Sequence, residues 1–112
     1  MVVTDTRTGG IDLVRTANAS VVRMWGEIDA ALRSEASAAL VGALERDLPV
    51  VVDATRVDFI DSAGVAFLVQ LCALGRDEGL QVSLRNPPEV VGEVLRLVGA
   101  DAHITHDSAD AA

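Results

Sequence analysis

Apolar residues along this chain follow strand-like spacing in some stretches and helix-like spacing in others, and the changes between the two divide it into elements. Residues 11–15 and 20–25 are short runs rich in Val, Ile and Leu, and they predict two β-strands separated by a short connection. The second run contains VVRMW, which is too continuously apolar for a strand with one wet face. We therefore expect this strand to be central and buried on both faces.

A helix is predicted at residues 30–45, where Leu and Ala recur at helical spacing. Asp29 is a good N-cap for this helix, because a carboxylate there accepts hydrogen bonds from N–H groups of the first turn. The Asp-Leu-Pro segment at 47–49 ends it, since proline cannot continue a helix. A further buried strand is expected at 50–53, followed by a short polar link.

The second half of the chain adds two helices and two strands. A helix is predicted from residue 62 to about 76, a strand at 81–85, a helix at 89–98 and a short last strand at 103–106. The order β-β-α-β-α-β-α-β contains repeated β-α-β units, which require right-handed crossovers and a mainly parallel sheet. The predicted fold is α/β, a mixed sheet of about four to five strands flanked by about three to four helices.

Length and composition fit a single domain over residues 1–112, with flexible arms expected at 1–10 and 107–112. The formal net charge is −8, from 17 acidic and 9 basic residues, and no basic patch is visible. We therefore expect no direct binding to nucleic acid or to an anionic membrane. Neither a secretion signal nor an apolar run of about 20 residues is present, so we expect a cytoplasmic protein.

The sequence offers little support for metal or cofactor chemistry. Cys72 is the only cysteine and lies in an apolar helical pattern, where a small buried thiol is the expected role. His103 and His106 point to opposite faces of the predicted last strand, so they do not easily share one metal. No P-loop or dinucleotide-binding glycine pattern occurs. We predict no bound metal and no cofactor.

The most informative segment is Asp61-Ser62-Ala63-Gly64, which places a hydroxyl at the start of a helix. One role is capping, in which Asp61 or Ser62 accepts a hydrogen bond from a first-turn N–H. A second is nucleophilic catalysis, but the pattern G-x-S-x-G is incomplete, because Ile60 occupies the first glycine position. A general base is also missing, since the only histidines lie near the C-terminus, and we do not predict an enzyme.

Phosphorylation is the third role open to Ser62. A helix N-terminus offers unpaired N–H groups and the positive end of a dipole, both of which suit a phosphate. The phosphate would add about 1.5 to 2 negative charges close to Asp61, and close to Asp29 and Asp58 if these lie nearby. A partner docked over the serine would meet both charge and bulk. The segment therefore suits a binding switch.

The chain resembles the STAS-domain anti-sigma factor antagonists, small bacterial proteins of partner-switching pathways that regulate transcription. The resemblance extends over residues 11–104. It rests on five segments: Gly26-Glu27-Ile28-Asp29, Val52-Asp53, Phe59-Ile60-Asp61-Ser62-Ala63-Gly64, Asn86-Pro87-Pro88 and Leu97-Val98-Gly99-Ala100. The Asp-Ser-x-Gly signature is the most specific of these.

The resemblance implies a non-enzymatic regulator that binds an anti-sigma factor, which then releases its sigma factor. The anti-sigma factor is commonly also a serine kinase with a GHKL-type ATP-binding fold. It inactivates the antagonist by phosphorylating the serine that follows the Asp, and a phosphoserine phosphatase restores the active form. By motif position the phosphorylated serine is Ser62, and the partner-binding residues are Asp29, Asp61, Ser62, Ala63 and Gly64.

Two features depart from the family pattern. Ala63 stands where many relatives carry a second hydroxyl residue, which leaves Ser62 as the one obvious acceptor. The Ala-Ala-Leu segment at 30–32 lacks the polar and aromatic character often found there, so we expect the affinity for a partner to differ. The alternative on the same fold is a STAS accessory subunit of a membrane transporter, including lipid-transfer ABC systems.

Overall fold

The structure is a computed structural model and describes residues 9–97 and 105–107. Within these residues the chain forms a five-stranded sheet and three α-helices, with one 3-10 turn before the first helix. The elements follow in the order β1 (Gly9–Arg15), β2 (Ser20–Ile28), η1 (Ala30–Leu32), α1 (Arg33–Arg46), β3 (Val50–Ile60), α2 (Ser62–Asp77), β4 (Val82–Arg85), α3 (Glu89–Leu97) and β5 (Thr105–Asp107).

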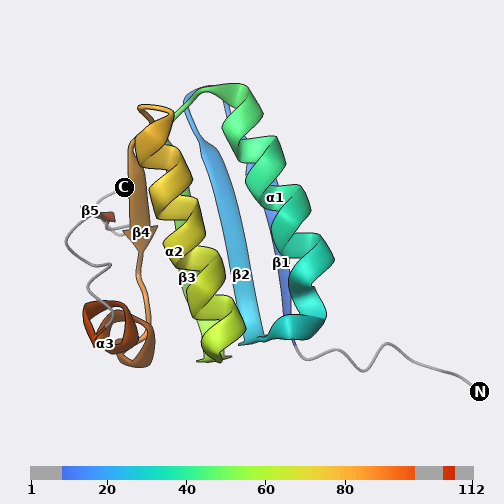
Figure 1. The fold of residues 1–112 in the computed structure, drawn as a ribbon, viewed down its shortest axis with the longest axis vertical. Coiled ribbons are helices and arrows are strands. Elements are labelled where there is room, and N and C mark those ends of the chain that lie inside the picture. The colour runs from blue at the N-terminus through green and yellow to red at the C-terminus, as the bar shows by residue number, and fades with distance from the viewer. Residues whose placement is uncertain (1–8, 98–104, 108–112) are drawn as a thin grey trace, which may run out of the picture.

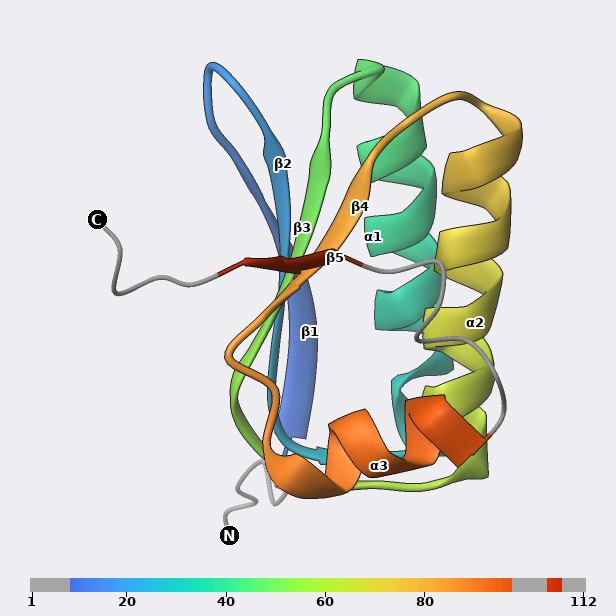
Figure 2. The ribbon, with the colours of Figure 1, turned by 90° about the vertical axis from the view of Figure 1, so that its left-hand side faces the viewer.

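The strands lie in the sheet in the same order as in the sequence. β1 and β2 form an antiparallel hairpin, and β2, β3, β4 and β5 run parallel to their neighbours. Figure 1 shows α1 and α2 side by side over one face of the sheet. In Figure 2 the sheet is edge-on, and α3 crosses the end of the molecule where α2 begins. The predicted α/β fold with a mainly parallel mixed sheet is confirmed.

The core lies between this sheet and the two covering helices. Val22 and Met24 of β2 and Val52 of β3 are at most 2 % exposed, and Leu68 and Leu71 of α2 pack against the same layer. The small residues of α1, Ala39 and Ala43 among them, are also buried and let the helix approach the sheet closely. The aliphatic helix faces predicted from the spacing therefore form the core.

The prediction that β2 is buried on both faces is wrong. Its burial alternates from Ser20 to Ile28, with Val22 and Met24 buried and Arg23, Trp25 and Glu27 exposed. The reason is that α1 and α2 both cover one face, and none of the described helices covers the other (Figure 2). The strand thus has one wet face, on which Trp25 is 38 % exposed.

The third strand is longer than predicted. β3 does not end at Asp53 but continues through the supposed polar link to Ile60. The register of its pairing with β2 shifts at two places. The first lies between the pairs Arg23–Asp53 and Trp25–Arg56, and the second lies just before the pair Glu27–Phe59. At each shift β3 has one residue more than β2. Such bulges interrupt the alternation of buried and exposed residues, which is why the spacing does not resemble a strand. Asp53 supports the first bulge by accepting hydrogen bonds from the Thr55 N–H at 3.0 Å and its hydroxyl at 2.6 Å.

The edges of the sheet also extend beyond the predicted strands. β1 begins at Gly9 rather than residue 11, so Gly9 and Gly10 belong to a strand and not to a flexible arm. Asp107 likewise belongs to β5. Gly10 pairs with Trp25 across the hairpin, and the indole ring lies over the glycine. Any side chain at position 10 would overlap the ring, so only glycine fits there. The remainder of both predicted arms, at 1–8 and 108–112, lies outside the described residues, as does His103.

Candidate functional site

Two aspartates end two neighbouring strands at the same edge of the sheet. Ile28 of β2 and Ile60 of β3 form the last pair of their parallel ladder, and Asp29 and Asp61 are the next residues in each chain segment. The backbone N–H of Asp61 also donates to the Ile28 carbonyl at 3.1 Å, which fixes the two turns to each other. The sequence placed both residues at helix starts, and the structure brings them together.

Each aspartate is an N-cap. Asp29 accepts a hydrogen bond from the Ala31 N–H at 3.0 Å and opens the 3-10 turn that leads into α1. Asp61 accepts from the N–H groups of Ala63 at 2.9 Å and Gly64 at 3.1 Å and opens α2. Asp61 is therefore the capping residue that the sequence could assign only to Asp61 or Ser62.

Ser62 is the first residue of α2 and is exposed. Because Asp61 occupies the first free N–H groups of the helix, the Ser62 side chain is not used for capping. Its hydroxyl makes no hydrogen bond within the part of the chain that the structure describes. Ser62 thus presents a free hydroxyl directly after the Asp61 cap, at the edge of the sheet where Asp29 also lies. The exposed Asp58 lies four residues before it on β3.

Gly64 sets how close the start of α2 comes to the strand ends. A Cβ at this position would lie 2.5 Å from Cγ1 of Ile60, 2.9 Å from Cγ2 of Ile28 and 3.1 Å from the Ile28 carbonyl oxygen. The two contacts to side-chain atoms are shorter than a Cβ tolerates unless something shifts, and the third, to backbone, is tight. The glycine of the Asp-Ser-x-Gly segment is therefore required so that the helix seats its first turn on the last residue pair of the ladder.

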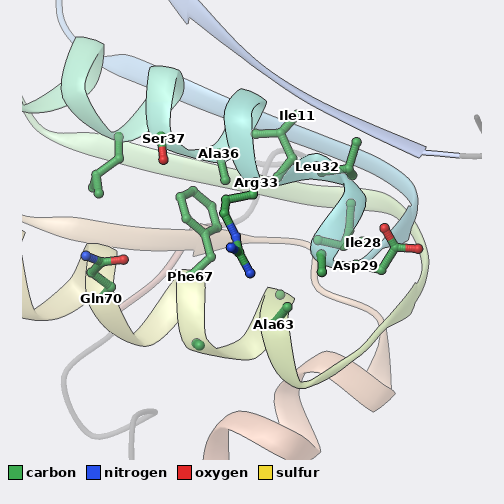
Figure 3. Close-up of a pocket in the computed structure, with 14 residues that line it drawn as sticks. Ile11, Ile28, Asp29, Leu32, Arg33, Ala36, Ser37, Ala63, Phe67 and Gln70 are labelled. Carbon is green, nitrogen blue, oxygen red and sulfur yellow. The ribbon is translucent and has the colours of Figure 1, made fainter.

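A cleft of about 330 Å³ separates α1 from α2 next to this edge (Figure 3). Ile11, Ile28 and Phe67 contribute to its apolar interior, and Asp29 lies at one end. The side chain of the exposed Arg33 extends from α1 towards α2 beside Phe67. Ala63 and Gly64 form part of the wall on the α2 side. The sequence alone does not predict this cleft, because no local pattern encodes the spacing of two helices.

Metal-ligating side chains and the cysteine are the candidates for other chemistry in the described part of the chain. Among the described residues no three His, Cys, Asp or Glu side chains are grouped so that they could hold a metal ion. Cys72 is buried within α2, and this burial raises the pKa of its thiol to about 11, with the nearby Arg76 charge opposing the shift. A thiol with such a pKa is almost entirely protonated at neutral pH and is a poor nucleophile.

No helix in the described part of the chain is both long enough and apolar enough to span a membrane. The arrangement at the edge of the sheet is a surface site, built from two capped turns, one exposed hydroxyl and an adjacent cleft. Such a site can bind a protein and can be changed by a modification of its hydroxyl.

In a comparison with protein families, residues 11–105 match the family described as "Mlab, STAS domain". None of the curated proteins compared with the chain matches it.

Solved structures with a similar fold include the following three. The phosphorylated form of the Bacillus cell fate determinant SpoIIAA matches with a TM-score of 0.70 at 20 % identity, over 87 % of this chain and 90 % of that one. An anti-sigma factor antagonist from Mycobacterium paratuberculosis matches with a TM-score of 0.69 at 24 % identity, over 93 % and 89 %. A protein with a SpoIIAA-like fold from Shewanella loihica matches with a TM-score of 0.60 at 12 % identity, over 96 % and 90 %. At these identities the likeness concerns the fold.

Proposed function

The chain belongs to the STAS domain family, and from this we propose that it is an anti-sigma factor antagonist whose binding is switched off by phosphorylation of Ser62. In this proposal the chain acts in the cytoplasm and is not an enzyme. Its partners are an anti-sigma factor that is also a GHKL-type serine kinase, and a phosphatase that removes the phosphate. Together with Ser62, the proposed partner-binding residues are Asp29, Asp61, Ala63 and Gly64.

The observation that carries the proposal is the exposed Ser62 hydroxyl directly after the Asp61 cap, at the edge of the sheet where Asp29 also lies. A kinase needs an accessible hydroxyl, and Ser62 is exposed at the start of α2. The fold also agrees, because one of the similar structures is named as an anti-sigma factor antagonist and another is of a phosphorylated form.

The local geometry indicates how a phosphate would act. The N–H groups of Ala63 and Gly64 already bond to Asp61, so a phosphate on Ser62 cannot take them without removing the cap. It would instead extend into solvent and add about 1.5 to 2 negative charges near Asp29 and Asp61. We therefore expect the modification to repel a docked partner by charge and bulk, while the fold remains the same.

The test uses the purified chain, its anti-sigma factor kinase and ATP, followed by mass-spectrometric mapping of the phosphate. We expect one phosphate, on Ser62, and loss of the complex between the modified chain and the kinase. Ser62→Ala should bind the kinase and accept no phosphate, and Ser62→Asp should bind weakly. Phosphate at another residue, or a stable complex with the phosphorylated chain, would contradict the switch.

A second candidate is an accessory subunit of a membrane transporter, built on the same STAS fold. The observation that favours it is the outer surface of α2, which carries no charged residue from Ser62 to Gly75. Permanent subunit interfaces are more apolar than transient ones, so such a surface also suits a constant partner. Copurification with a transporter ATPase, and no phosphate on Ser62, would favour this candidate over the antagonist.

A further inference from the structure

The outer surface of α2 is unusual in an acidic protein. The chain is 23 % charged with a formal net charge of −8, but α2 has no charged residue between Ser62 and Gly75. Several residues in this segment face outward, and Ala66, Val69 and Gln70 are exposed. Val69 is 38 % exposed, although burial would stabilise it. A solvated helix surface normally carries charged residues, so this one is suited to being covered.

This uncharged surface has a hollow on each side of a ridge. One hollow is the cleft between α1 and α2, and the other is shallow, apolar and lined by Ser62, Val65 and Val69. Ala66 and Gln70 line both, so the two hollows meet along the ridge that these residues form. The surface is therefore continuous from the cleft to the Ser62 hydroxyl.

The cleft itself has the form of a pocket for one apolar group. Its walls carry small residues, Ala36 on α1 and Ala63 and Ala66 on α2, and its floor is apolar. A cavity of about 150 Å³ lined by Leu, Ile and Phe is known to hold benzene. The cleft is about 330 Å³ and is thus large enough for one Leu- to Phe-sized side chain. Ala30 also lines the cleft and adds only a methyl group to it.

We propose that this cleft receives an apolar side chain of the anti-sigma factor, of Leu to Phe size, as the anchor of the complex that Ser62 switches. The inference rests on the proposed function and adds the contact from which the affinity comes. Interfaces derive most of their binding energy from a few anchors in desolvated pockets, surrounded by a polar rim. Here the exposed Arg33 and Gln70 and the half-buried Asp29 supply polar groups around the apolar interior (Figure 3). Ser62 lines the neighbouring hollow.

A protein side chain is a better occupant than a free small molecule for two reasons. The cleft opens onto the same uncharged surface that leads to Ser62, so a partner that covers the serine also covers the cleft. Small-molecule sites instead place several polar groups inside the pocket to fix the ligand. Here the polar residues Arg33, Ser37 and Gln70 are exposed, and Asp29 is already engaged as a cap.

The experiment fills the cleft with an apolar group. Ser37 is exposed on α1, lines the cleft and points towards α2 (Figure 3), so Ser37→Phe inserts a ring where the anchor would lie. Helical side chains lean towards the helix N-terminus, which directs this ring towards Arg33. Ser34→Phe is the matched control, since Ser34 is exposed on the same helix and does not line the cleft.

Binding of each variant to the purified anti-sigma factor kinase with ADP is measured by isothermal titration calorimetry, and circular dichroism verifies the folds. We expect Ser37→Phe to weaken binding at least about tenfold and Ser34→Phe to leave it within about twofold of the wild type. Unchanged or tighter binding by Ser37→Phe, or equal loss in both variants, would overturn the anchor and leave the proposed function intact. No binding by the wild type would overturn the proposed function and the anchor with it.

Discussion

Asp29 and Asp61 follow Ile28 and Ile60, the last residue pair between β2 and β3, and each caps the turn that it begins. The Asp61 N–H donates to the Ile28 carbonyl at 3.1 Å, so the two turns are joined by backbone as well as by the sheet. The position of Ser62 therefore depends on strand register, since a shift of one residue would separate the two caps.

The first prediction separates the cap from the hydroxyl beside it. Asp61→Ala removes the acceptor of two N–H groups and a negative charge at the helix start, so we expect a loss of about 1 to 2 kcal/mol in the free energy of unfolding. Ser62→Ala removes an exposed hydroxyl that caps no helix N–H, so it should change the free energy of unfolding by less than about 0.5 kcal/mol. Urea denaturation of both variants measures the difference. Equal losses would show that Ser62 shares the capping role.

The second prediction concerns the close approach at Gly64. Gly64→Ala places a methyl group 2.9 Å from Cγ2 of Ile28 and 3.1 Å from its carbonyl oxygen, so the start of α2 must shift. We expect a loss of about 1 to 3 kcal/mol, the usual cost of overpacking. Gly92→Ala in α3 is the control, because a Cβ there meets nothing within 4 Å and should stabilise the chain by about 0.4 to 1 kcal/mol. The midpoint temperature of thermal unfolding should therefore fall in Gly64→Ala and rise in Gly92→Ala.

The candidate site is predictable from sequence because its signals are local. Asp29 and Asp61 are recognisable as caps from the residues that follow them, and the order of elements brings the ends of parallel strands to one edge. The helix ends are equally local, since Asp47 at φ 56° and Gly79 at φ 75° adopt the left-handed conformation that stops α1 and α2.

The features that the sequence analysis missed all depend on distant parts of the chain. The bulges in β3 arise from its pairing with β2, so the residues around Thr55 and Asp58 do not alternate as a regular strand does. Both α1 and α2 lie on one face, which leaves Trp25 on an open sheet although its neighbours are apolar. The cleft depends on how far apart two helices lie, and no local pattern encodes that spacing.

The third prediction uses Trp25 as a reporter of the open face. It is the single tryptophan, and its indole lies against Gly10 of β1. Gly10→Ala would overlap the ring and push it off the strand into solvent. We expect a red shift of the fluorescence emission relative to the wild type. Gly92→Ala, remote in sequence and with an open Cβ position, should leave the emission maximum unchanged. An unshifted spectrum in Gly10→Ala would show that the ring does not lie there.

The fourth prediction concerns stability at alkaline pH. Burial raises the pKa of the Cys72 thiol from 9.0 to about 11. Because the pKa is higher in the folded state, the folded chain holds the thiol proton more tightly than the unfolded chain does. The resulting contribution to the free energy of unfolding is fully present below the unfolded-state pKa. It is lost as the pH rises to the folded-state pKa. We therefore expect the free energy of unfolding to fall between about pH 9 and pH 11, by about 2 kcal/mol, as measured by urea denaturation at each pH.

The composition of this chain makes that measurement specific to one group. The sequence contains no lysine and no tyrosine, arginine side chains keep their charge throughout this interval, and an α-amino group titrates near pH 8. Cys72 is thus the only side chain that changes its charge between pH 9 and pH 11. Cys72→Ala removes this titration, so its unfolding free energy should be lower at pH 8 because of the lost packing, but flat across the interval. A slope that persists in Cys72→Ala would assign the loss of stability to another cause.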